Sequence, residues 1–166
     1  GEQQQQDQQD GFDTFDLPVA QTECELSCFV QVVFDEAQGL WSEHPLELNI
    51  SVATPCYLIA DQQLLKTAIL NLIDNAVKYS SGQVPVLISL TAEGQQAVVS
   101  VKNVGAVIAE QDRSRLFEKY FRGGSSANTQ GAGLGLYLVK KIVEQLSGNI
   151  RLASSSAEGT VIKISL

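Results

Sequence analysis

The stretch DQQLLKTAILNLIDNAVKY, residues 61–79, carries the clearest structural signal in the chain. Its apolar side chains return every three or four residues, which is the spacing of one helix face buried against a core. The residues on that face are Leu65, Ile69, Leu72 and Ala76. Asp61 stands directly before the periodic pattern and is a typical N-cap residue. The stretch therefore predicts a core helix that runs from Asp61 to about Tyr79.

The same helix carries a polar stripe, defined by Asn71, Asn75 and Lys78, at positions i, i+4 and i+7. An amide oxygen is a hard ligand that suits Mg²⁺, and a lysine ammonium is a point charge that suits phosphate. The stripe therefore indicates a site for Mg²⁺ and phosphate. Taken alone, it is more often the solvated edge of an amphipathic helix, because helix interiors tolerate asparagine without favouring it.

The sequence on both sides of this helix predicts strands and further helices in alternation. We expect strands at 23–28, 46–52, 84–90, 97–101, 149–153 and 160–166, and helices at 29–41, 112–121 and 134–146. A turn at Glu93-Gly94 joins the strands expected at 84–90 and 97–101. A helix C-cap signal at Gly148 ends the helix expected at 134–146. The predicted fold class is an α/β (α+β) two-layer sandwich. Its mixed, mostly antiparallel sheet has about five strands or more and is covered on one face by about three helices.

Length and composition fit one globular domain with a distinct N-terminal segment. The chain has 166 residues, of which 44% are hydrophobic, and this is enough for one core. Residues 1–18 are rich in Gln and Asp. We interpret them as a disordered tail or linker ahead of a domain at 19–166, because they contain too little apolar surface to offset their ordering entropy.

Charge and cysteine usage exclude several classes of function. Residues 1–65 contain twelve acids and no Lys or Arg, whereas residues 66–166 contain seven acids and eleven bases. A general nucleic-acid binder would show a basic face and a high pI, so that class is excluded. A small anionic ligand is compatible with the C-terminal part. The one His and three Cys provide no zinc motif and no disulfide framework, and they fit reduced cytosolic thiols.

A glycine-rich stretch, GAGLGL at residues 131–136, directly precedes the last predicted helix. Glycines let a backbone approach phosphate closely, and the start of the following helix favours an anion. The stretch is not a dinucleotide fingerprint, because position 136 is Leu and no strand precedes it. It is not a P-loop, because Gly-Lys-Ser/Thr is absent. It indicates either a phosphate-binding loop of another kind or a flexible hinge before a core helix.

Two further stretches indicate a function only when their order along the chain is considered together with the stretches above. Alone, LFEKYF (116–121) is typical of a packing helix and NVG (103–105) of a turn at a strand end. The series NLIDNAVKYS (71–80), NVG, LFEKYF and GAGLGL resembles the N, G1, F and G2 boxes of bacterial sensor histidine kinases. The resemblance is to their catalytic and ATP-binding domain, of the Bergerat-type fold shared with gyrase-type ATPases. It covers about residues 20–166.

This resemblance implies ATP and Mg²⁺ as cofactors, and it implies roles for residues of the first box. Asn75 is implied as the Mg²⁺ ligand, and Asn71, one turn earlier, helps to hold phosphate or metal. Lys78 is implied as a phosphate contact, and Tyr79 lies against the ribose and base of the nucleotide.

Further roles follow from the other boxes. Residues 122–130 are implied to form an ATP lid, from which Arg122 could reach the γ-phosphate. The implied catalytic residues are Asn71, Lys78 and Arg122. The implied nucleotide-binding residues are Asn71, Asn75, Lys78, Tyr79, Asn103, Gly105, Gly131, Gly133, Leu134, Gly135 and Thr160.

Two features depart from the pattern of the family. Its G1 box usually reads Asp-x-Gly-x-Gly, and the Asp accepts a hydrogen bond from the adenine amino group. Here Asn103 and Val107 stand at the first and last positions. The asparagine oxygen still accepts that bond, but without charge assistance. The phosphoaccepting His is also missing, because the one His, His44, precedes Pro45 between a predicted helix and strand, where we expect a surface loop.

The implied function is that of an enzyme, a protein histidine kinase, which donates the γ-phosphoryl group of Mg-ATP to a histidine on a separate dimerisation domain. Gyrase-type ATPases place a water-activating Glu four residues before the metal-binding Asn. Asn71 stands there in this chain, and an amide cannot serve as a base, so transfer to a protein is favoured over hydrolysis. Two alternatives stay open: a degenerate ATP fold that acts by protein binding, and an anti-sigma or serine-kinase relative.

The expected partners are ATP, the dimerisation domain of the same full-length kinase and, indirectly, a response regulator; nucleic acid is not expected. We expect this chain to be a monomeric, cytoplasmic fragment of a protein that is anchored in the bacterial inner membrane.

Overall fold

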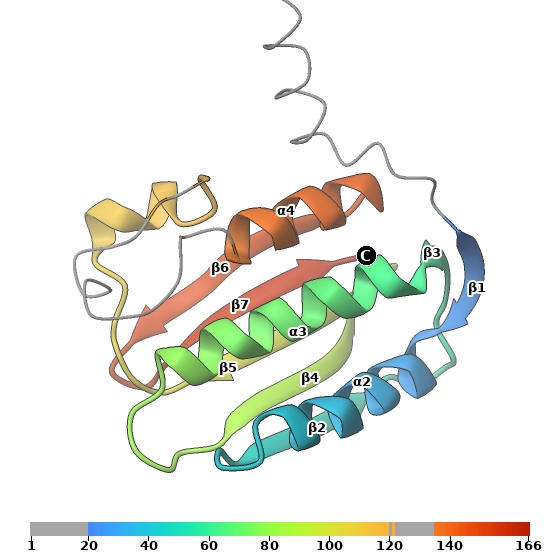
Figure 1. Cartoon of the computed structure of the whole chain (residues 1–166). Helices are drawn as coiled ribbons and strands as arrows, with labels where there is room; N and C mark the ends of the chain where they lie inside the picture. The colour runs from blue at the N-terminus through green and yellow to red at the C-terminus, as the bar shows by residue number, and fades with distance from the viewer. Residues whose placement is uncertain (1–19, 120, 122–134) are drawn as a thin grey trace, which may run out of the picture.

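A computed structural model describes residues 20–119, 121 and 135–166 (Figure 1). The tail or linker predicted at residues 1–18 lies outside these ranges. In chain order the elements are β1 (Gln21–Glu25), α2 (Leu26–Leu40), β2 (Leu46–Ser51), β3 (Tyr57–Asp61), α3 (Gln62–Lys78), β4 (Val86–Glu93), β5 (Gln96–Asn103), the 3-10 helix η1 (Glu110–Arg115), α4 (Gly135–Gln145), β6 (Asn149–Ser156) and β7 (Gly159–Ser165).

The described strands form a five-stranded sheet in the order β2-β4-β5-β7-β6, with β1 and β3 paired separately. Strands β2 and β4 are parallel, and the other neighbours in the large sheet are antiparallel. Helices α2, α3 and α4 lie on one face of this sheet (Figure 1). The predicted two-layer sandwich with a mixed, mostly antiparallel sheet is therefore confirmed. None of the helices in the described ranges is long and apolar enough to cross a bilayer.

Helix α3 is the central helix of this layer, and its predicted bounds are confirmed. The carboxylate of Asp61 caps its start by accepting hydrogen bonds from the N–H groups of Gln63 at 2.9 Å and Leu64 at 3.2 Å. Tyr79 is the C-cap residue. The buried face, which packs into the core, consists of Leu65, Ala68, Ile69, Leu72, Ile73 and Ala76.

The start of α2 differs from the prediction. The expected strand at 23–28 ends at Glu25, and the helix expected from residue 29 begins at Leu26. The reason is the N-cap residue Glu25, which the spacing of the apolar residues does not reveal. The Glu25 carboxylate accepts hydrogen bonds from the N–H groups of Cys28 at 2.8 Å and Ser27 at 3.2 Å. The hydrogen bond from Cys28, followed by that from Ser27, lowers the pKa of Glu25.

Two other expectations needed correction. The strand β3 at Tyr57–Asp61 was not predicted, and the helix expected at 112–121 is the shorter 3-10 helix Glu110–Arg115. The guanidinium of Arg113 is bonded to the carbonyl of Ile108, five residues earlier, at 3.3 Å, and this contact holds the segment in a tight turn. Propensity and periodicity do not report such a contact, because it depends on the tertiary structure.

The end of α4 agrees with the prediction in position but differs in detail. The N–H of Gly148 donates to Val143 O at 3.0 Å, and the N–H of Ser147 donates to Glu144 O at 3.0 Å, which is the Schellman pattern. Ser147, with φ of 59°, takes the left-handed position that glycine usually occupies. Gly148 is needed for a different reason, since a Cβ there would meet the carbonyl oxygen of Ser165.

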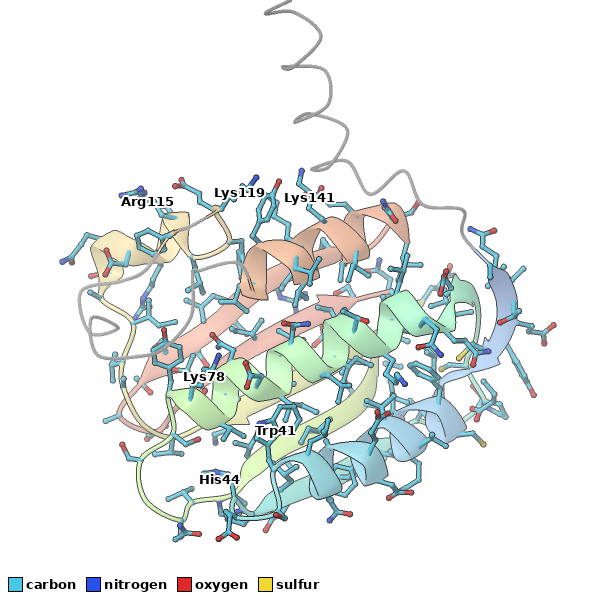
Figure 2. All side chains as sticks on the ribbon, viewed as in Figure 1. Trp41, His44, Lys78, Arg115, Lys119 and Lys141 are labelled. Carbon is cyan, nitrogen blue, oxygen red and sulfur yellow. The ribbon has the colours of Figure 1, made fainter. Side chains whose placement is uncertain are left out.

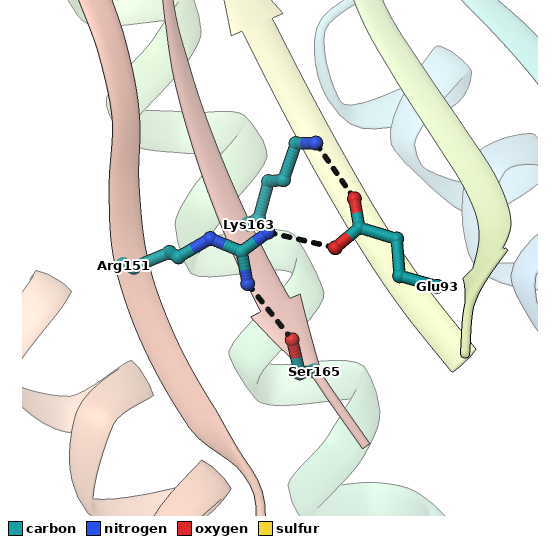
Figure 3. Close-up of polar contacts among 4 residues, drawn as sticks. All are labelled: Glu93, Arg151, Lys163 and Ser165. Atoms are coloured by element: carbon teal, nitrogen blue, oxygen red, sulfur yellow. Dashed lines mark hydrogen bonds and ion pairs between the residues drawn. The ribbon is translucent and has the colours of Figure 1, made fainter. Parts of the chain in front are cut away.

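The face of the sheet opposite the helices carries a charged cluster that ties three strands together (Figure 3). Glu93 at the end of β4 binds Lys163 Nζ at 2.9 Å and Arg151 Nη2 at 2.8 Å. These two cations, Lys163 first, lower the pKa of Glu93. All three side chains are partly exposed, so solvent screening leaves the cluster with little effect on stability.

The cap of α3 provides a test of the fold. We expect Asp61→Ala to lower the free energy of unfolding by about 1 kcal/mol, because the N–H groups of Gln63 and Leu64, and also that of Ala20, lose their acceptor. Asp61→Asn retains an oxygen acceptor and should stay close to the parent protein. Urea denaturation of the three proteins measures both effects. Equal stability of Asp61→Ala and the parent would show that the cap is not stabilising.

Candidate functional site

The end of α3 is joined to the end of β5 by backbone hydrogen bonds. The N–H of Ser81 donates to Val104 O at 2.9 Å, and the N–H of Ala106 donates to Tyr79 O at 3.2 Å. Between them, Ser80 and Gly105 form an isolated antiparallel bridge. Position 105 requires glycine, because a Cβ there would collide with the Tyr79 carbonyl. Two predicted site residues, Tyr79 and Gly105, are therefore in direct contact.

The polar stripe of α3 lies beside the start of α4. Asn71 Nδ2 donates to Thr67 O at 2.8 Å, which fixes the orientation of the amide. A Cβ placed on Gly135 would lie 3.7 Å from Asn71 Oδ1, so the amide oxygen borders the first turn of α4. The half-buried Asn75, one turn later, makes no side-chain hydrogen bond to any other described residue. The structure thus brings Asn71 and Gly135 together and leaves the Asn75 amide available.

Lys78, the third member of the stripe, lies on the last turn of α3 (Figure 2). Its ammonium forms an ion pair with the Asp74 carboxylate at 2.8 Å, and the two side chains are 41% and 37% exposed. An exposed i,i+4 pair of this kind contributes about 0.3–0.5 kcal/mol, so a phosphate can displace the carboxylate easily. Asp74 was absent from the predicted site, although its i,i+4 spacing from Lys78 is visible in the sequence.

The buried polar group at the end of β5 is Asn103, which is 4% exposed. Its Nδ2 has no hydrogen-bond partner among the residues that the structure describes. Thr160, 6% exposed, is its partner in the register of β5 and β7. The Thr160 hydroxyl is 2.7 Å from that of Ser155, and either group could be the donor. An unpaired buried donor such as Nδ2 costs about 1–3 kcal/mol, which makes Asn103 a candidate contact for a bound molecule.

Two residues absent from the prediction hold the segment that follows Asn103. Ser155 Oγ accepts a hydrogen bond from the N–H of Ile108 at 2.9 Å. Arg113 Nη2 donates to Ser155 O at 2.8 Å, and its Nε donates to Ile108 O at 3.3 Å. Neither residue belongs to a recognisable motif, since Ser155 lies within a run of three serines. Their contribution depends on tertiary contacts that the sequence pattern does not contain.

Other predicted site residues cannot be placed. Arg122, Gly131, Gly133 and Leu134 lie outside the described residues, as do the predicted lid at 122–130 and most of the glycine-rich stretch. Within the described ranges, no group of three or more His, Cys, Asp or Glu side chains could hold a metal ion. The amide oxygens of the stripe, Asn71 Oδ1 and Asn75 Oδ1, are hard ligands of the kind that suits Mg²⁺.

His44 lies in the turn between α2 and β2, as predicted (Figure 2). It is half-buried rather than exposed, and its N–H donates to Trp41 O at 3.0 Å. Its Nε2 atom is buried and has no hydrogen-bond partner in the described part of the chain. Figure 2 draws His44 on the side of the helix layer away from α4.

The helix-covered mixed sheet, with paired amides on its central helix, defines the class of protein. Residues 60–166 match the family of histidine kinase-, DNA gyrase B- and HSP90-like ATPases, and the chain belongs to that family. The resemblance to the catalytic domain of sensor histidine kinases is also confirmed. The chain is 34% identical over 123 residues to the sensor-like histidine kinase SenX3 of Mycobacterium tuberculosis (strain ATCC 25618 / H37Rv), covering 73% of the chain and 30% of SenX3.

Solved structures agree with this assignment. The mycobacterial sensor histidine kinase MprB superposes with a TM-score of 0.74 at 29% identity, covering 87% of this chain and 97% of that structure. Full-length ShkA in complex with AMPPNP superposes with a TM-score of 0.73 at 23% identity, over 90% of this chain and 31% of ShkA, and shows the shared fold. The chain spans less than a third of SenX3, so it corresponds to only one part of that protein.

The serine that holds Ile108 provides a test of the site. We expect Ser155→Ala to lower the free energy of unfolding by about 1–3 kcal/mol, because the Ile108 N–H and the Thr160 hydroxyl lose a shared partner. Amide hydrogen exchange at Ile108 should accelerate. Ser154→Ala, at the exposed neighbouring position, is the matched control. Identical exchange at Ile108 in the two variants would contradict the assigned role.

Proposed function

We propose that this chain binds Mg-ATP and donates the γ-phosphoryl group to a histidine on a separate dimerisation domain of a sensor kinase. One observation carries the proposal: Asn71 borders Gly135 while the end of α3 is bonded to the Gly105 loop. Three sequence motifs that are far apart in the chain are thereby joined around one helix. Family membership supports ATP as the ligand.

The purine base would bind at the end of β5. Asn103 is buried there with an unpaired amide group, and Thr160 is its cross-strand partner. Tyr79 and Gly105 lie next to this position, because their backbones are in contact. We assign Tyr79 to the ribose and base, and Thr160 to the surroundings of the adenine.

The triphosphate would lie along the polar stripe of α3. Asn75 would hold Mg²⁺ through its amide oxygen, with Asn71 beside it and Lys78 exchanging Asp74 for a phosphate oxygen. When bound, Mg²⁺ would neutralise part of the charge that phosphoryl transfer spreads over the phosphate oxygens. We extend the site to Gly135 of α4 and, among residues that the structure does not describe, to Gly131, Gly133, Leu134 and Arg122.

Transfer is favoured over hydrolysis because an amide, and no base, stands four residues before the metal ligand. Asn71 stands one turn before Asn75, and its Nδ2 is already bonded to Thr67 O. An amide has no useful basicity, so it cannot take a proton from water. The acceptor would be a histidine supplied by the dimerisation domain, and a response regulator would receive the phosphoryl group afterwards.

A second candidate function is a degenerate ATP fold that acts by binding another protein. Asn103 in place of the usual acid is the observation that favours it, because adenine binding loses a charge-assisted hydrogen bond. Calorimetric titration with ATP, with and without Mg²⁺, tests both functions. Mg²⁺-dependent binding supports the kinase domain, whereas the absence of any nucleotide binding supports the protein-binding module.

The proposed setting is a longer protein. Residues 19–166 would be its catalytic domain and residues 1–18 part of a linker. The domain would act in the cytoplasm, within a kinase anchored in the bacterial inner membrane.

The metal ligand can be tested directly. We expect Asn75→Ala to weaken Mg-ATP binding by about tenfold or more, equivalent to about 1.4 kcal/mol, because an oxygen ligand is removed. Binding of ATP without Mg²⁺ should change little. Asn49→Ala, on an exposed position of β2, is the control for loss of an amide elsewhere. Equal Mg-ATP affinity in Asn75→Ala and the parent would contradict the assignment of Asn75.

The acceptor can be tested with γ-labelled ATP. We expect the 166-residue chain alone to acquire no stable label, because its one His precedes Pro45 in the α2–β2 turn and does not lie on an acceptor helix. Adding the dimerisation domain of the full-length kinase, in trans or in cis, should produce labelling on that domain. Stable label on His44 would contradict the proposed division of roles.

A further inference from the structure

The amide of Asn103 is a buried donor that the protein leaves unused. The side chain is 4% exposed, and its Nδ2 has no partner among the described residues. Buried polar groups are nearly always paired, so an exception within a binding site indicates a bond that a ligand completes. A carboxylate at this position would have no donor to leave unpaired, because an ionised acid only accepts hydrogen bonds.

Thr160, the cross-strand neighbour of Asn103, can also either donate or accept a hydrogen bond. Thr160 faces Asn103 across β5 and β7, and side chains paired in this way have Cβ atoms about 4.5–5.5 Å apart. The Thr160 hydroxyl is 2.7 Å from the Ser155 hydroxyl, and the bond between them can run in either direction. Thr160 can therefore present either its hydrogen or a lone pair to a third group.

We propose, on the basis of the nucleotide site inferred above, that Asn103 lets this site accept 6-oxopurine nucleotides, such as ITP and GTP, as well as ATP. Adenine presents an amino donor at position 6, whereas hypoxanthine and guanine present a carbonyl acceptor there. The Asn103 amide accepts from the first through Oδ1 and donates to the second through Nδ2. A half-turn of the amide exchanges the two atoms without breaking a hydrogen bond of Nδ2 to any described residue.

An aspartate at position 103 would impose the opposite selectivity. Both of its oxygens are acceptors, so it pairs with the adenine amino group. At position 6 of a 6-oxopurine it meets another acceptor, and it could bond only by shifting to the N1 proton. Sites that demand one hydrogen-bonding group reject an analogue without it by about 10⁴–10⁵-fold. With asparagine that demand is absent, and we expect the affinities for ATP and ITP to differ by less than about tenfold.

ITP is the decisive probe because it differs from ATP at the 6 position of the base and at the N1 proton that accompanies it. GTP carries an additional amino group at position 2, which has its own spatial requirements. Calorimetric titration of the chain with Mg-ATP and Mg-ITP therefore reports on position 6, and a parallel titration with Mg-GTP reports whether the 2-amino group is also accepted.

The experiment compares the parent chain with Asn103→Asp. The parent should bind Mg-ATP and Mg-ITP with affinities within about tenfold of each other. Asn103→Asp should bind Mg-ATP about fivefold more tightly through a charge-assisted bond, and Mg-ITP at least about 100-fold more weakly than Mg-ATP. Asn49→Asp, on an exposed position of β2, makes the same change of charge away from the site and should keep the parental ratio.

Two results would overturn the inference while leaving the proposed function intact. One is a parent chain that binds Mg-ATP but binds Mg-ITP more than about 100-fold more weakly. The other is a folded Asn103→Asp protein, checked by circular dichroism, with an unchanged ratio of the two affinities. The ratio of the Mg-ATP and Mg-ITP affinities is measured on the parent chain itself. The inference therefore stays testable even if Asn103→Asp does not fold. A parent chain that binds no nucleotide overturns the proposed function and the inference together.

Discussion

The contact between the carbonyl of Tyr79 and the backbone of Gly105 is the constraint on which the site depends. It fixes the end of α3 against the loop after β5, and it tolerates no side chain at position 105. Because the polar stripe lies on α3 and Asn103 lies at the end of β5, this contact sets the distance between the two groups. Backbone bonds, rather than side chains, therefore position the proposed phosphate and base sites.

The described part of the site is close to electrical neutrality. Its amides and hydroxyls carry no charge, and the ammonium of Lys78 is paired with Asp74 at 2.8 Å. The oxygens that Asn71 and Asn75 would offer a divalent cation are neutral amide oxygens. The cation would arrive with the triphosphate, whose oxygens supply the negative charge. Such an arrangement couples metal binding to nucleotide binding without a dedicated metal cage.

Much of this architecture could be predicted from the sequence, where local pattern decides the structure. The helix capped by Asp61 and the hairpin around Gly94 follow from periodicity and turn chemistry, and the stripe of α3 follows from helix geometry. Strand β3 was missed because its apolar run, Tyr57–Asp61, does not alternate, and its partner β1 is distant in sequence. Ser155 and Arg113 could not be found, because the bonds from Ile108 to Ser155 and from Arg113 to Ser155 join residues 47 and 42 positions apart.

The parallel pairing of β2 with β4 has a consequence for the order in which the chain assembles. The hairpins β4–β5 and β6–β7 close through short turns, whereas β2 reaches β4 only across the whole of β3 and α3. Non-local pairings must first overcome the entropy of closing the intervening loop, so they form late. We expect β2 to join the sheet after α3 has docked, and this edge to be the first part of the sheet to open under mild denaturing conditions.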